Sequence, residues 1–344
     1  MTDTIISARN VQVRFGETVA LGGFTLDVPS GSLVALVGPS GCGKTTALRT
    51  IAGFQDVNSG TISIRDVLVN GPSTHVAPER RRVGMVFQEF ALFPHITVAE
   101  NVGYGVDGAD RVERVRSTLR LVGLDGYGDR FPHELSGGEQ QRIALARALA
   151  PEPEVILLDE PFSNLDAPQR ERMRRELRKI IHGAGLTAVF VTHDQSEALA
   201  IADVIAVMRD GAVVQVGAPD EVYAHPISPW VARFLGDAVM VDGVVQSGSV
   251  ATTFGSVETD LEEGSAVTVM IRPEWVVVTP SSAGQARIID REFYGHDQRV
   301  EIKVRGGSTI EALVSGRVPV RIGDTVDIEI TDSIVFALEP LRGT

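Results

Sequence analysis

The chain carries the sequence Gly38-Pro-Ser-Gly-Cys-Gly-Lys-Thr45 between an apolar run and a run of helix-forming residues. The apolar run, Ser32–Val37, predicts a buried strand, and the run Thr45–Ala52, which Gly53 closes, predicts a helix. A glycine-rich turn in this context fits the pattern G-x-x-x-x-G-K-[ST]. Its glycines let backbone N–H groups close around phosphate oxygens, and the helix N-terminus adds its positive dipole end. The sequence therefore predicts a phosphate-binding loop.

Two side chains of this loop indicate a nucleotide and a divalent metal ion. The Lys44 ammonium can lie against the β and γ phosphates, and the Thr45 hydroxyl can bind Mg²⁺. Cys42 is the only cysteine of the chain, and we expect it to be a small filler without chemistry of its own. The residues expected to line the nucleotide are Gly38, Pro39, Ser40, Gly41, Cys42, Gly43, Lys44, Thr45 and Thr46.

Two adjacent acids, Asp159 and Glu160, follow a second apolar run, Val155–Leu158. Ligands of a parallel sheet bind at the carboxyl ends of its strands, so both acids are expected near the phosphate-binding loop. Asp159 is suited to hold Mg²⁺ through its water shell, and Glu160 is suited to polarise an attacking water. An isolated acidic pair is more often part of a solvated loop, and only the neighbouring phosphate loop favours catalysis.

A second helix start, Leu135-Ser136-Gly137-Gly138, also suits an anion. Ser136 can cap the helix predicted after it, and the two glycines leave backbone N–H groups open to a ligand. An ordinary N-cap is the simpler interpretation of such a start taken alone. A single nucleotide needs only one such start, however. We therefore expect Ser136, Gly137 and Gly138 to contact a nucleotide held by another copy of the chain.

The order of the elements predicts two domains in the 344 residues. Up to about Gly236, buried strands alternate with helical stretches such as Gln169–His182, which implies a mostly parallel α/β sheet. Beyond it, short alternating runs predict a small antiparallel β domain. The stretch Gly217–Gly236 holds three prolines and no regular period, and is the expected connection. We assign residues 1–236 to the first domain and 237–344 to the second.

The composition restricts the class of protein. Lys and Arg number 32 against 45 Asp and Glu, a net charge of −13, and the chain from Met240 onward holds 16 acids against 9 bases. Nucleic acid is therefore disfavoured as a partner, because phosphate backbones need a basic surface. No apolar run approaches the roughly 18 residues of a membrane-spanning helix, and the N-terminus lacks the features of a secretory signal. We expect an intracellular protein.

Together these motifs resemble those of the ATP-binding subunits of ATP-binding cassette (ABC) transporters, over residues 5 to about 236. Gly38–Thr45 matches Walker A, Leu135–Gln140 the signature and Val155–Asp159 Walker B. The resemblance implies an α/β P-loop NTPase cassette with a helical subdomain. Four further matches are the adenine-stacking aromatic Phe15, the Q-loop glutamine Gln88, the D-loop Ser163–Asp166 and the switch histidine His193.

The resemblance also implies a mechanism with ATP and Mg²⁺ as cofactors. Two copies of the chain hold two ATP molecules head to tail, each between Walker A of one copy and Ser136–Gly138 of the other. Glu160 acts as the general base on the attacking water, while Lys44 and His193 steady the charge on the γ-phosphate. The residues implied around Mg²⁺ are Thr45, Gln88 and Asp159.

The implied partners are a second copy of the chain, transmembrane permease subunits and an extracytoplasmic substrate-binding protein. The chain would then be a peripheral subunit on the cytoplasmic face of the cell membrane. The segment Phe90–Ile96 is apolar for a loop and suits a docking groove for the permease, although core packing explains it equally well. The stretch between Gly105 and Arg111 is shorter than is usual in the family, which affects only the details of this docking.

The C-terminal β domain is similar to the regulatory domain of importer ATPases, an OB-like fold called TOBE, and Ile271–Glu274 matches its characteristic turn. Within the importers the chain most resembles ferric-iron import ATPases, but polyamine, sulfate and sugar importers share most of the same segments. A non-transport ABC ATPase of DNA repair or translation would carry coiled-coil insertions, zinc cysteines or two cassettes. The segments that resemble the ferric-iron branch are Gly38–Thr46, Glu100–Gly105, Asp129–Phe131, Ser163–Ala167, Thr192–Ala198 and Phe234–Ala238.

Overall fold

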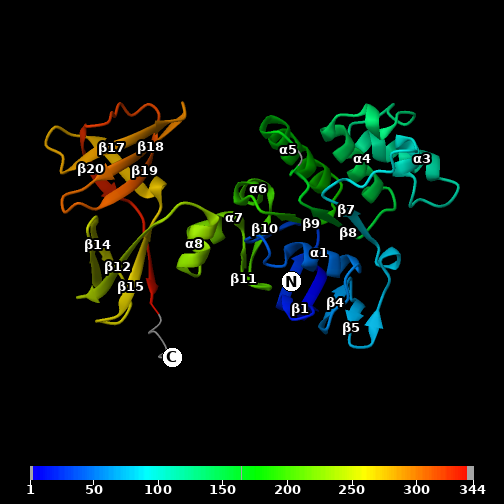
Figure 1. Cartoon of the computed structure of the whole chain (residues 1–344), viewed down its shortest axis with the longest axis horizontal. Coiled ribbons are helices and arrows are strands. Elements are labelled where there is room, and N and C mark those ends of the chain that lie inside the picture. The colour runs from blue at the N-terminus through cyan, green and yellow to red at the C-terminus, as the bar shows by residue number, and fades with distance from the viewer. Residues whose placement is uncertain (1–2, 164, 339–344) are drawn as a thin grey trace. The chain divides into compact units, whose positions relative to one another are not determined.

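The computed structural model describes residues 3–163 and 165–338, and the chain divides into two compact units between Val222 and Tyr223. Figure 1 shows the first unit in blue to green and the second in lime to red. The division lies within α7 (Pro219–Ala224), so α8 (Pro229–Leu235) belongs to the second unit. Compactness alone does not test the domain boundary expected after residue 236, which stays a prediction.

The centre of the first unit is a six-stranded sheet. All its neighbouring strands are parallel except β10 and β11, so the predicted mostly parallel sheet is confirmed. Every residue of β3, β8 and β9 is buried, as expected for strands covered on both faces. In sheet order the strands are β11 (Ala212–Gly217), β10 (Val204–Arg209), β3 (Leu33–Val37), β9 (Thr187–Thr192), β8 (Val155–Asp159) and β7 (Val83–Val86).

A second, antiparallel sheet of the first unit was not predicted. Its long strands are apolar on one face only, which is a weaker sequence signal than a continuous apolar run. The helix α1 (Lys44–Ala52) contacts β2 of this sheet as well as β8 and β9, so it joins the two sheets. In sheet order the strands are β2 (Thr18–Pro29), β1 (Thr4–Phe15), β4 (Ser59–Ile64), β5 (Val67–Gly71) and β6 (Thr74–His75).

Most of the remaining helices of the first unit begin at a side-chain cap. The oxygens of Thr97, Ser136, Asp166 and Asp194 each accept a hydrogen bond from an amide of the following first turn, which satisfies donors that the helix itself leaves unpaired. Contacts among α2, α3 and α4 form the expected helical subdomain. The helices are α2 (Val98–Val102), α3 (Arg111–Leu121), α4 (Gly137–Leu149), α5 (Ala167–Gly183) and α6 (Gln195–Ile201), with short 3₁₀ turns at Pro78–Arg80 and Pro132–Glu134.

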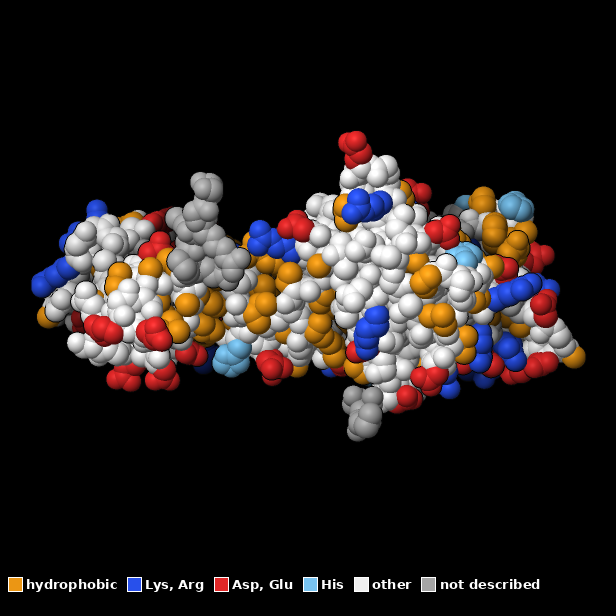
Figure 2. Space-filling model, turned by 90° about the horizontal axis from the view of Figure 1, so that it is seen from below, with side chains coloured by type: hydrophobic (Ala, Val, Ile, Leu, Met, Phe, Trp, Pro, Cys, Tyr) orange, Lys and Arg blue, Asp and Glu red, His pale blue; other side chains and the backbone are white. Residues whose placement is uncertain are grey.

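The second unit consists of two antiparallel sheets around an apolar core, which confirms the predicted small β domain. One sheet has the order β14 (Gly255–Glu258), β13 (Ser249–Thr252), β12 (Val239–Gln246), β15 (Ala266–Ile271) and β21 (Ile334–Ala337). The other has the order β16 (Val276–Pro280), β20 (Thr325–Ile330), β17 (Ala286–Phe293), β18 (Asp297–Lys303) and β19 (Thr309–Ser315). On the face shown in Figure 2, acidic side chains gather along the lower edge of this unit at the left.

The connection contains two short helices that the sequence period did not reveal. With six and seven residues, α7 and α8 are too short to show a helical repeat of apolar side chains. Both begin with a proline, whose fixed φ suits a first helical position and whose missing N–H costs nothing there. In the part of the chain that the structure describes, no helix has both the length and the apolar character needed to cross a membrane.

The turn at Ile271–Glu274 fixes this connection to the sheet of the second unit. The Arg272 side chain is fully buried and donates hydrogen bonds to the carbonyl oxygens of Ala232 (3.0 Å), Asp237 (3.2 Å) and Tyr223 (2.9 Å). Its guanidinium also stacks on the Tyr223 ring at 3.9 Å, and the Tyr223 hydroxyl donates to Glu274. Pro273 follows at the start of a 3₁₀ turn, Pro273–Trp275.

We predict that Arg272→Met lowers the free energy of unfolding of the second unit by about 3 kcal/mol, because three carbonyl groups, one buried and two partly buried, lose their donor at about 1 kcal/mol each. Both tryptophans, Trp230 and Trp275, lie in this unit, so urea denaturation followed by tryptophan fluorescence reports it selectively. The control, Arg287→Met at an exposed position of β17, should change the stability by less than about 0.5 kcal/mol. Equal midpoints for the two variants would contradict the role of Arg272.

Candidate nucleotide site

The phosphate-binding loop joins the end of β3 to the start of α1, whose first residue is Lys44. The Lys44 ammonium is buried and donates to the carbonyl oxygens of Gly38 (2.6 Å) and Pro39 (3.0 Å), so it points across the loop. The amides in the first turn of a helix have no carbonyl partner within it, and they are therefore available to phosphate oxygens. The loop combines one fixed cation with several backbone donors.

The packing of the loop against β2 explains why one of its glycines is needed. Gly43 has a φ of +102°, and a Cβ atom there would lie 2.3 Å from the carbonyl oxygen of Ala20. β2 pairs with β1, whose last residue, Phe15, has a side chain that is 52% exposed. An exposed ring on the hairpin that flanks the phosphate loop suits a nucleobase, and the adenine-stacking role of Phe15 stays a prediction.

Two of the three residues predicted to bind Mg²⁺, Thr45 and Asp159, meet where α1 contacts β8, whereas the third, Gln88, donates to Glu160. The Thr45 hydroxyl donates to Asp159 Oδ1 at 3.0 Å, and a hydroxyl beside a carboxylate is the kind of hard oxygen donor that Mg²⁺ takes. Within residues 3–163 and 165–338, no group of three His, Cys, Asp or Glu side chains could hold a metal by itself. The residues present therefore fit a Mg²⁺ ion that Thr45 and Asp159 share with phosphate oxygens and water.

Asp159 is only 3% exposed at the end of β8. Burial raises the pKa of its carboxyl above the usual value, because a charged carboxylate loses its hydration there, and the hydrogen bond from Thr45 opposes this shift. The positive charges of Arg49 and Lys44 also oppose it. A cation beside Asp159 would therefore stabilise the ionised carboxylate more strongly than it would stabilise an exposed one.

The Glu160 carboxylate contacts two other predicted site residues, the Q-loop glutamine Gln88 and the switch histidine His193. Gln88 Nε2 donates to Glu160 Oε2 at 3.2 Å, and His193 Nδ1 lies 3.4 Å from the same oxygen. Glu160 has a φ of +45°, a left-handed conformation that costs a non-glycine residue roughly 1–2 kcal/mol. Its amide donates to Val191 O of β9 at 3.1 Å, so the neighbouring strand holds this strained residue in place. The structure thus brings Gln88, Glu160 and His193 together.

Ser136 caps α4 through a reciprocal pair of hydrogen bonds with Glu139. The Ser136 hydroxyl and amide both donate to the Glu139 carboxylate, at 2.7 and 2.8 Å, and the Glu139 amide donates back to the hydroxyl. Tyr127 also donates to this carboxylate, at 3.0 Å. The pKa of the Glu139 carboxyl is lowered mainly by the two hydrogen bonds that it accepts from Ser136. The ordinary N-cap interpretation is therefore correct for the isolated chain, and it does not exclude a second role.

The two glycines after Ser136 are not explained by packing within the chain. A Cβ atom at Gly137 or Gly138 would meet its nearest neighbour at 4.0 or 3.8 Å, and neither residue has a positive φ. Over the residues that are described, no hydrogen bond or ion pair joins Ser136–Gly138 to the phosphate loop. This space fits the expectation that another molecule approaches the helix start.

The predicted D-loop and switch segment are connected by Arg170 of α5. Its guanidinium donates to Leu165 O at 3.1 Å and lies 3.7 Å from the Glu197 carboxylate. Glu197 also accepts a hydrogen bond from Thr192, the residue before His193, and burial raises the pKa of Glu197. Asn164 of the predicted D-loop lies outside the described residues.

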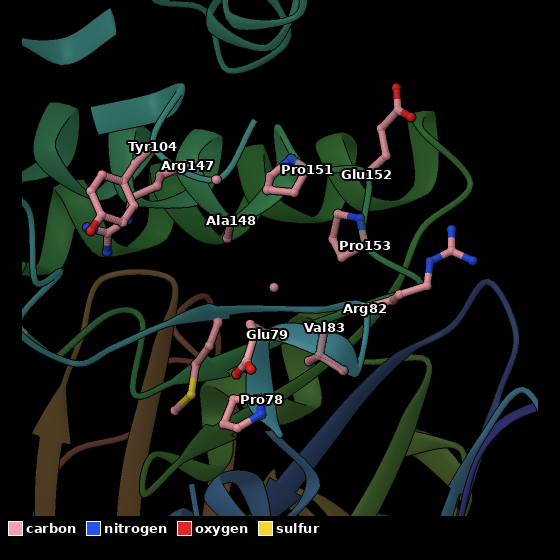
Figure 3. A pocket seen from close by; sticks show the side chains of 13 residues that line it. Pro78, Glu79, Arg82, Val83, Tyr104, Arg147, Ala148, Pro151, Glu152 and Pro153 are labelled. Carbon is pink, nitrogen blue, oxygen red and sulfur yellow. The ribbon is translucent and has the colours of Figure 1, made fainter. Parts of the chain in front are cut away.

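Next to this site the first unit has an apolar groove with a volume of about 570 Å³. Its lining includes Phe54, Phe87, Phe93, Tyr104 and Arg147, so part of the apolar segment Phe90–Ile96 faces the groove. An adjoining cavity of about 430 Å³ shares Tyr104 and Arg147. Both residues line that cavity, and Figure 3 shows them on the side away from Pro78 and Glu79.

The sequence analysis named Phe90 and Ala91 only as part of the apolar segment Phe90–Ile96, and it missed Arg147 beside this groove. Phe90 and Ala91 are consecutive non-glycine residues with φ values of +59° and +49°. Arg147 of α4 donates to their carbonyl oxygens, at 2.9 Å to Phe90 and 2.6 Å to Ala91. The one signal in the sequence was an arginine within the otherwise apolar run Ile143–Ala150.

Comparisons with known proteins agree with this geometry. Residues 21–163 match the family described as ABC transporter, and residues 269–338 match the TOBE domain. The sulfate/thiosulfate import ATP-binding protein CysA 1 of Chromobacterium violaceum is 42% identical over 98% of this chain and 99% of its own. The chain belongs to the ATP-binding subunits of ABC transporters. It combines the ABC cassette with a C-terminal TOBE domain.

Two further relatives extend the comparison for this ABC subunit. The Fe(3+) ions import ATP-binding protein FbpC 1 of Rhodococcus jostii is 45% identical over 90% of each chain. A dimeric ATP-binding cassette in a post-hydrolysis state, bound to ADP and phosphate, is 33% identical. It covers 62% of this chain and 99% of its own, with a TM-score of 0.55. The cassette fold of the ABC subunit is thereby established, while iron is only one of the cargoes named among its relatives.

We predict that Asp159→Asn raises the thermal midpoint of the nucleotide-free ABC subunit at pH 7, because the neutral amide carries no charge that loses hydration at this buried position. The raised pKa means that the ionised Asp159 side chain destabilises the fold at neutral pH, and that this cost disappears as the pH falls through the folded-state pKa. The difference between variant and wild type should therefore shrink on acidification. Thermal denaturation at several pH values measures it, and a lower midpoint for Asp159→Asn at pH 7 would contradict the interpretation.

Proposed function

We propose that this chain is the ATP-hydrolysing subunit of an import system, and that Glu160 is its general base. The observation that carries the proposal is the arrangement around the Glu160 carboxylate, with Gln88 Nε2 at 3.2 Å and His193 Nδ1 at 3.4 Å. Glu160 directly follows Asp159, which accepts the Thr45 hydrogen bond. One strand end thus carries both a metal-binding carboxylate and a carboxylate for the attacking water.

The reaction follows from the residues of the chain. Lys44 and the amides at the start of α1 hold the β and γ phosphates, and Glu160 takes a proton from the water that attacks the γ-phosphorus. His193 and Lys44 steady the charge on the phosphate oxygens. Thr45, Asp159 and Gln88 would hold Mg²⁺, and the ion would neutralise part of the negative charge on the phosphate oxygens.

The site is completed by a second copy of the chain. In the proposed homodimer, Ser136–Gly138 of one copy closes over a nucleotide held by the phosphate loop of the other. Two features support this arrangement: the space beside Gly137 and Gly138, and the relative that was solved as a dimer with ADP and phosphate. Backbone donors at the start of α4 would then reach the γ-phosphate.

We predict that Glu160→Gln lowers the ATPase rate by about 10²–10⁴-fold, because the amide cannot accept the proton from water. The variant keeps the size of the side chain and the phosphate-binding groups, so it should bind ATP and accumulate as an ATP-bound dimer. Steady-state ATPase assays and sedimentation with ATP and Mg²⁺ measure the two effects. A Glu160→Gln protein that stays monomeric at high concentration would refute the dimer arrangement.

Two matched variants make this experiment specific. Lys44→Ala in the Glu160→Gln background should not dimerise, because it loses the cation of the phosphate loop. Gly138→Ala in the same background should fold and bind ATP, since a Cβ at this position meets nothing closer than 3.8 Å within the chain. It should nevertheless fail to dimerise if a nucleotide on the other copy must approach this helix start.

The groove beside Phe93 and Tyr104 is the proposed docking site for transmembrane permease subunits. It is apolar, it lies next to the Q-loop segment, and Tyr104 in its wall is 67% exposed. The permease would supply the membrane-spanning part that the described helices lack, so the chain is proposed to act as a peripheral subunit on the cytoplasmic face of the cell membrane. An extracytoplasmic substrate-binding protein would deliver the cargo.

Ferric iron is the proposed cargo, and sulfate is the alternative. The resemblance of six segments to the ferric-iron branch and the 45% identity to the Rhodococcus jostii iron protein support iron. The sulfate protein of Chromobacterium violaceum, which aligns with almost the whole chain, supports sulfate. No contact to a cargo is expected from this chain itself, because the permease and the binding protein hold it.

We predict that a strain without this chain loses high-affinity uptake of radioactive ferric iron and keeps its uptake of radioactive sulfate. Reintroduced wild-type protein should restore iron uptake, whereas Glu160→Gln should leave it at the level of the deletion strain. The opposite pattern, with sulfate uptake lost and iron uptake kept, would replace iron with sulfate and leave the importer function standing. Normal uptake of both would contradict both cargoes.

A further inference from the structure

The segment from Gln88 to Phe93 connects the candidate hydrolytic site to the groove. At its first end, Gln88 Nε2 donates to Glu160. At its other end, the Phe93 amide donates to Asn101 Oδ1 at 2.9 Å, and Asn101 Nδ2 donates back to Phe93 O at 3.0 Å. Asn101 is fully buried in α2, so this end is firmly attached to the helical subdomain. Any displacement of the middle of the segment would therefore be transmitted to Gln88.

The middle of the segment is strained. Phe90 and Ala91 both have left-handed φ values, which side chains with a Cβ atom adopt only when their surroundings require it. Each amide closes a tight local turn, from Phe90 N to Phe87 O at 2.9 Å and from Ala91 N to Glu89 O at 2.6 Å. Ala91 is also exposed, so burial of its own side chain does not explain the conformation. Something outside the segment has to stabilise it.

Arg147 provides that support. Its planar guanidinium donates one hydrogen bond to each of the two strained residues, through Nη2 to Phe90 O and through Nη1 to Ala91 O. It also lies 5.6 Å from the centre of the Phe93 ring, which packs on Tyr104 with 4.6 Å between ring centres. Burial lowers the pKa of Arg147, because its guanidinium gives up part of its hydration in this place.

We propose that Arg147 is a positioning residue for hydrolysis: by holding the carbonyl groups of Phe90 and Ala91 it keeps the strained turn that presents Gln88 to Glu160. This deepens the proposed function and rests on it, because Gln88 and Glu160 act on ATP only there. Arg147 also lines the groove, so a permease segment seated there would contact the residue that sets the position of Gln88. α4 carries both Arg147 and, at its start, Ser136–Gly138, the proposed contact to the nucleotide of the partner copy.

The test compares Arg147→Met and Arg147→Lys in the full-length chain. Methionine keeps the length of the side chain but cannot donate, so hydrogen–deuterium exchange of residues 88–93 should rise by about tenfold, while the exchange of α4 stays unchanged. The kcat for ATP should fall by about tenfold with KM within about twofold of wild type, because the phosphate loop is intact. Lysine keeps the charge and can donate to one of the two carbonyl groups. The changes in exchange and in kcat of Arg147→Lys should therefore lie between those of wild type and Arg147→Met.

A second substitution separates positioning from general stability. Ala91→Gly removes the energetic penalty for a left-handed φ at this residue. The double variant Arg147→Met with Ala91→Gly should therefore have a kcat about threefold higher than Arg147→Met alone. The control is Ala184→Gly in the same background, because Ala184 is exposed but has an ordinary φ of −96°. It should recover nothing.

Either of two results would overturn the proposal: unchanged exchange of residues 88–93 in Arg147→Met, or equal recovery by Ala91→Gly and Ala184→Gly. The exchange measurement needs neither ATP hydrolysis nor a permease. If the wild-type chain hydrolyses no ATP, the proposed function is contradicted. The exchange measurement still decides in that case whether Arg147 holds residues 88–93 in place.

Discussion

The hydrogen bond between the Thr45 hydroxyl and the Asp159 carboxylate holds the candidate site together. It joins the first turn of α1 to the end of β8, two elements that lie far apart in the sequence. Asp159 is buried at the last position of its strand, and the next residue, Glu160, takes a left-handed conformation. This contact brings the phosphate loop, the carboxylate beside the candidate metal site and the candidate base to one place.

Three non-glycine residues with a positive φ lie along one path through the first unit. Glu160, Phe90 and Ala91 all have positive φ values. The Glu160 amide donates to a carbonyl oxygen of β9, and the carbonyl oxygens of Phe90 and Ala91 accept hydrogen bonds from Arg147 of α4. Strained residues persist only where their surroundings over-determine them, and they tend to mark functional sites. Here they flank Gln88, which lies between the candidate base and the groove. The hydrogen bonds of these residues connect the candidate hydrolytic site to the groove, although the residues lie far apart in the sequence.

The sequence predicted the structure correctly where the deciding interactions lie within a few residues of one another. The buried strands β3, β8 and β9, the glycine-rich turn before α1 and the serine cap of α4 follow from apolar runs, glycines and caps that act within a few residues. It was uninformative where the pattern was weak or long-range. The half-exposed strands of the antiparallel sheet and the two short helices α7 and α8 show no clear period, and the role of Arg272 depends on carbonyl groups up to 49 residues away.

The sequence by itself determined the chemistry of the candidate site, because the types and spacings of Lys44, Thr45, Asp159 and Glu160 admit few other uses. It also determined the family, since several motifs occur in a fixed order. Only the tertiary structure decided which side chains meet. Gln88 and His193 converge on Glu160, and Arg147 supports Phe90 and Ala91, through contacts between different elements. Such contacts depend on how strands and helices pack, and no local pattern in a single sequence records that packing.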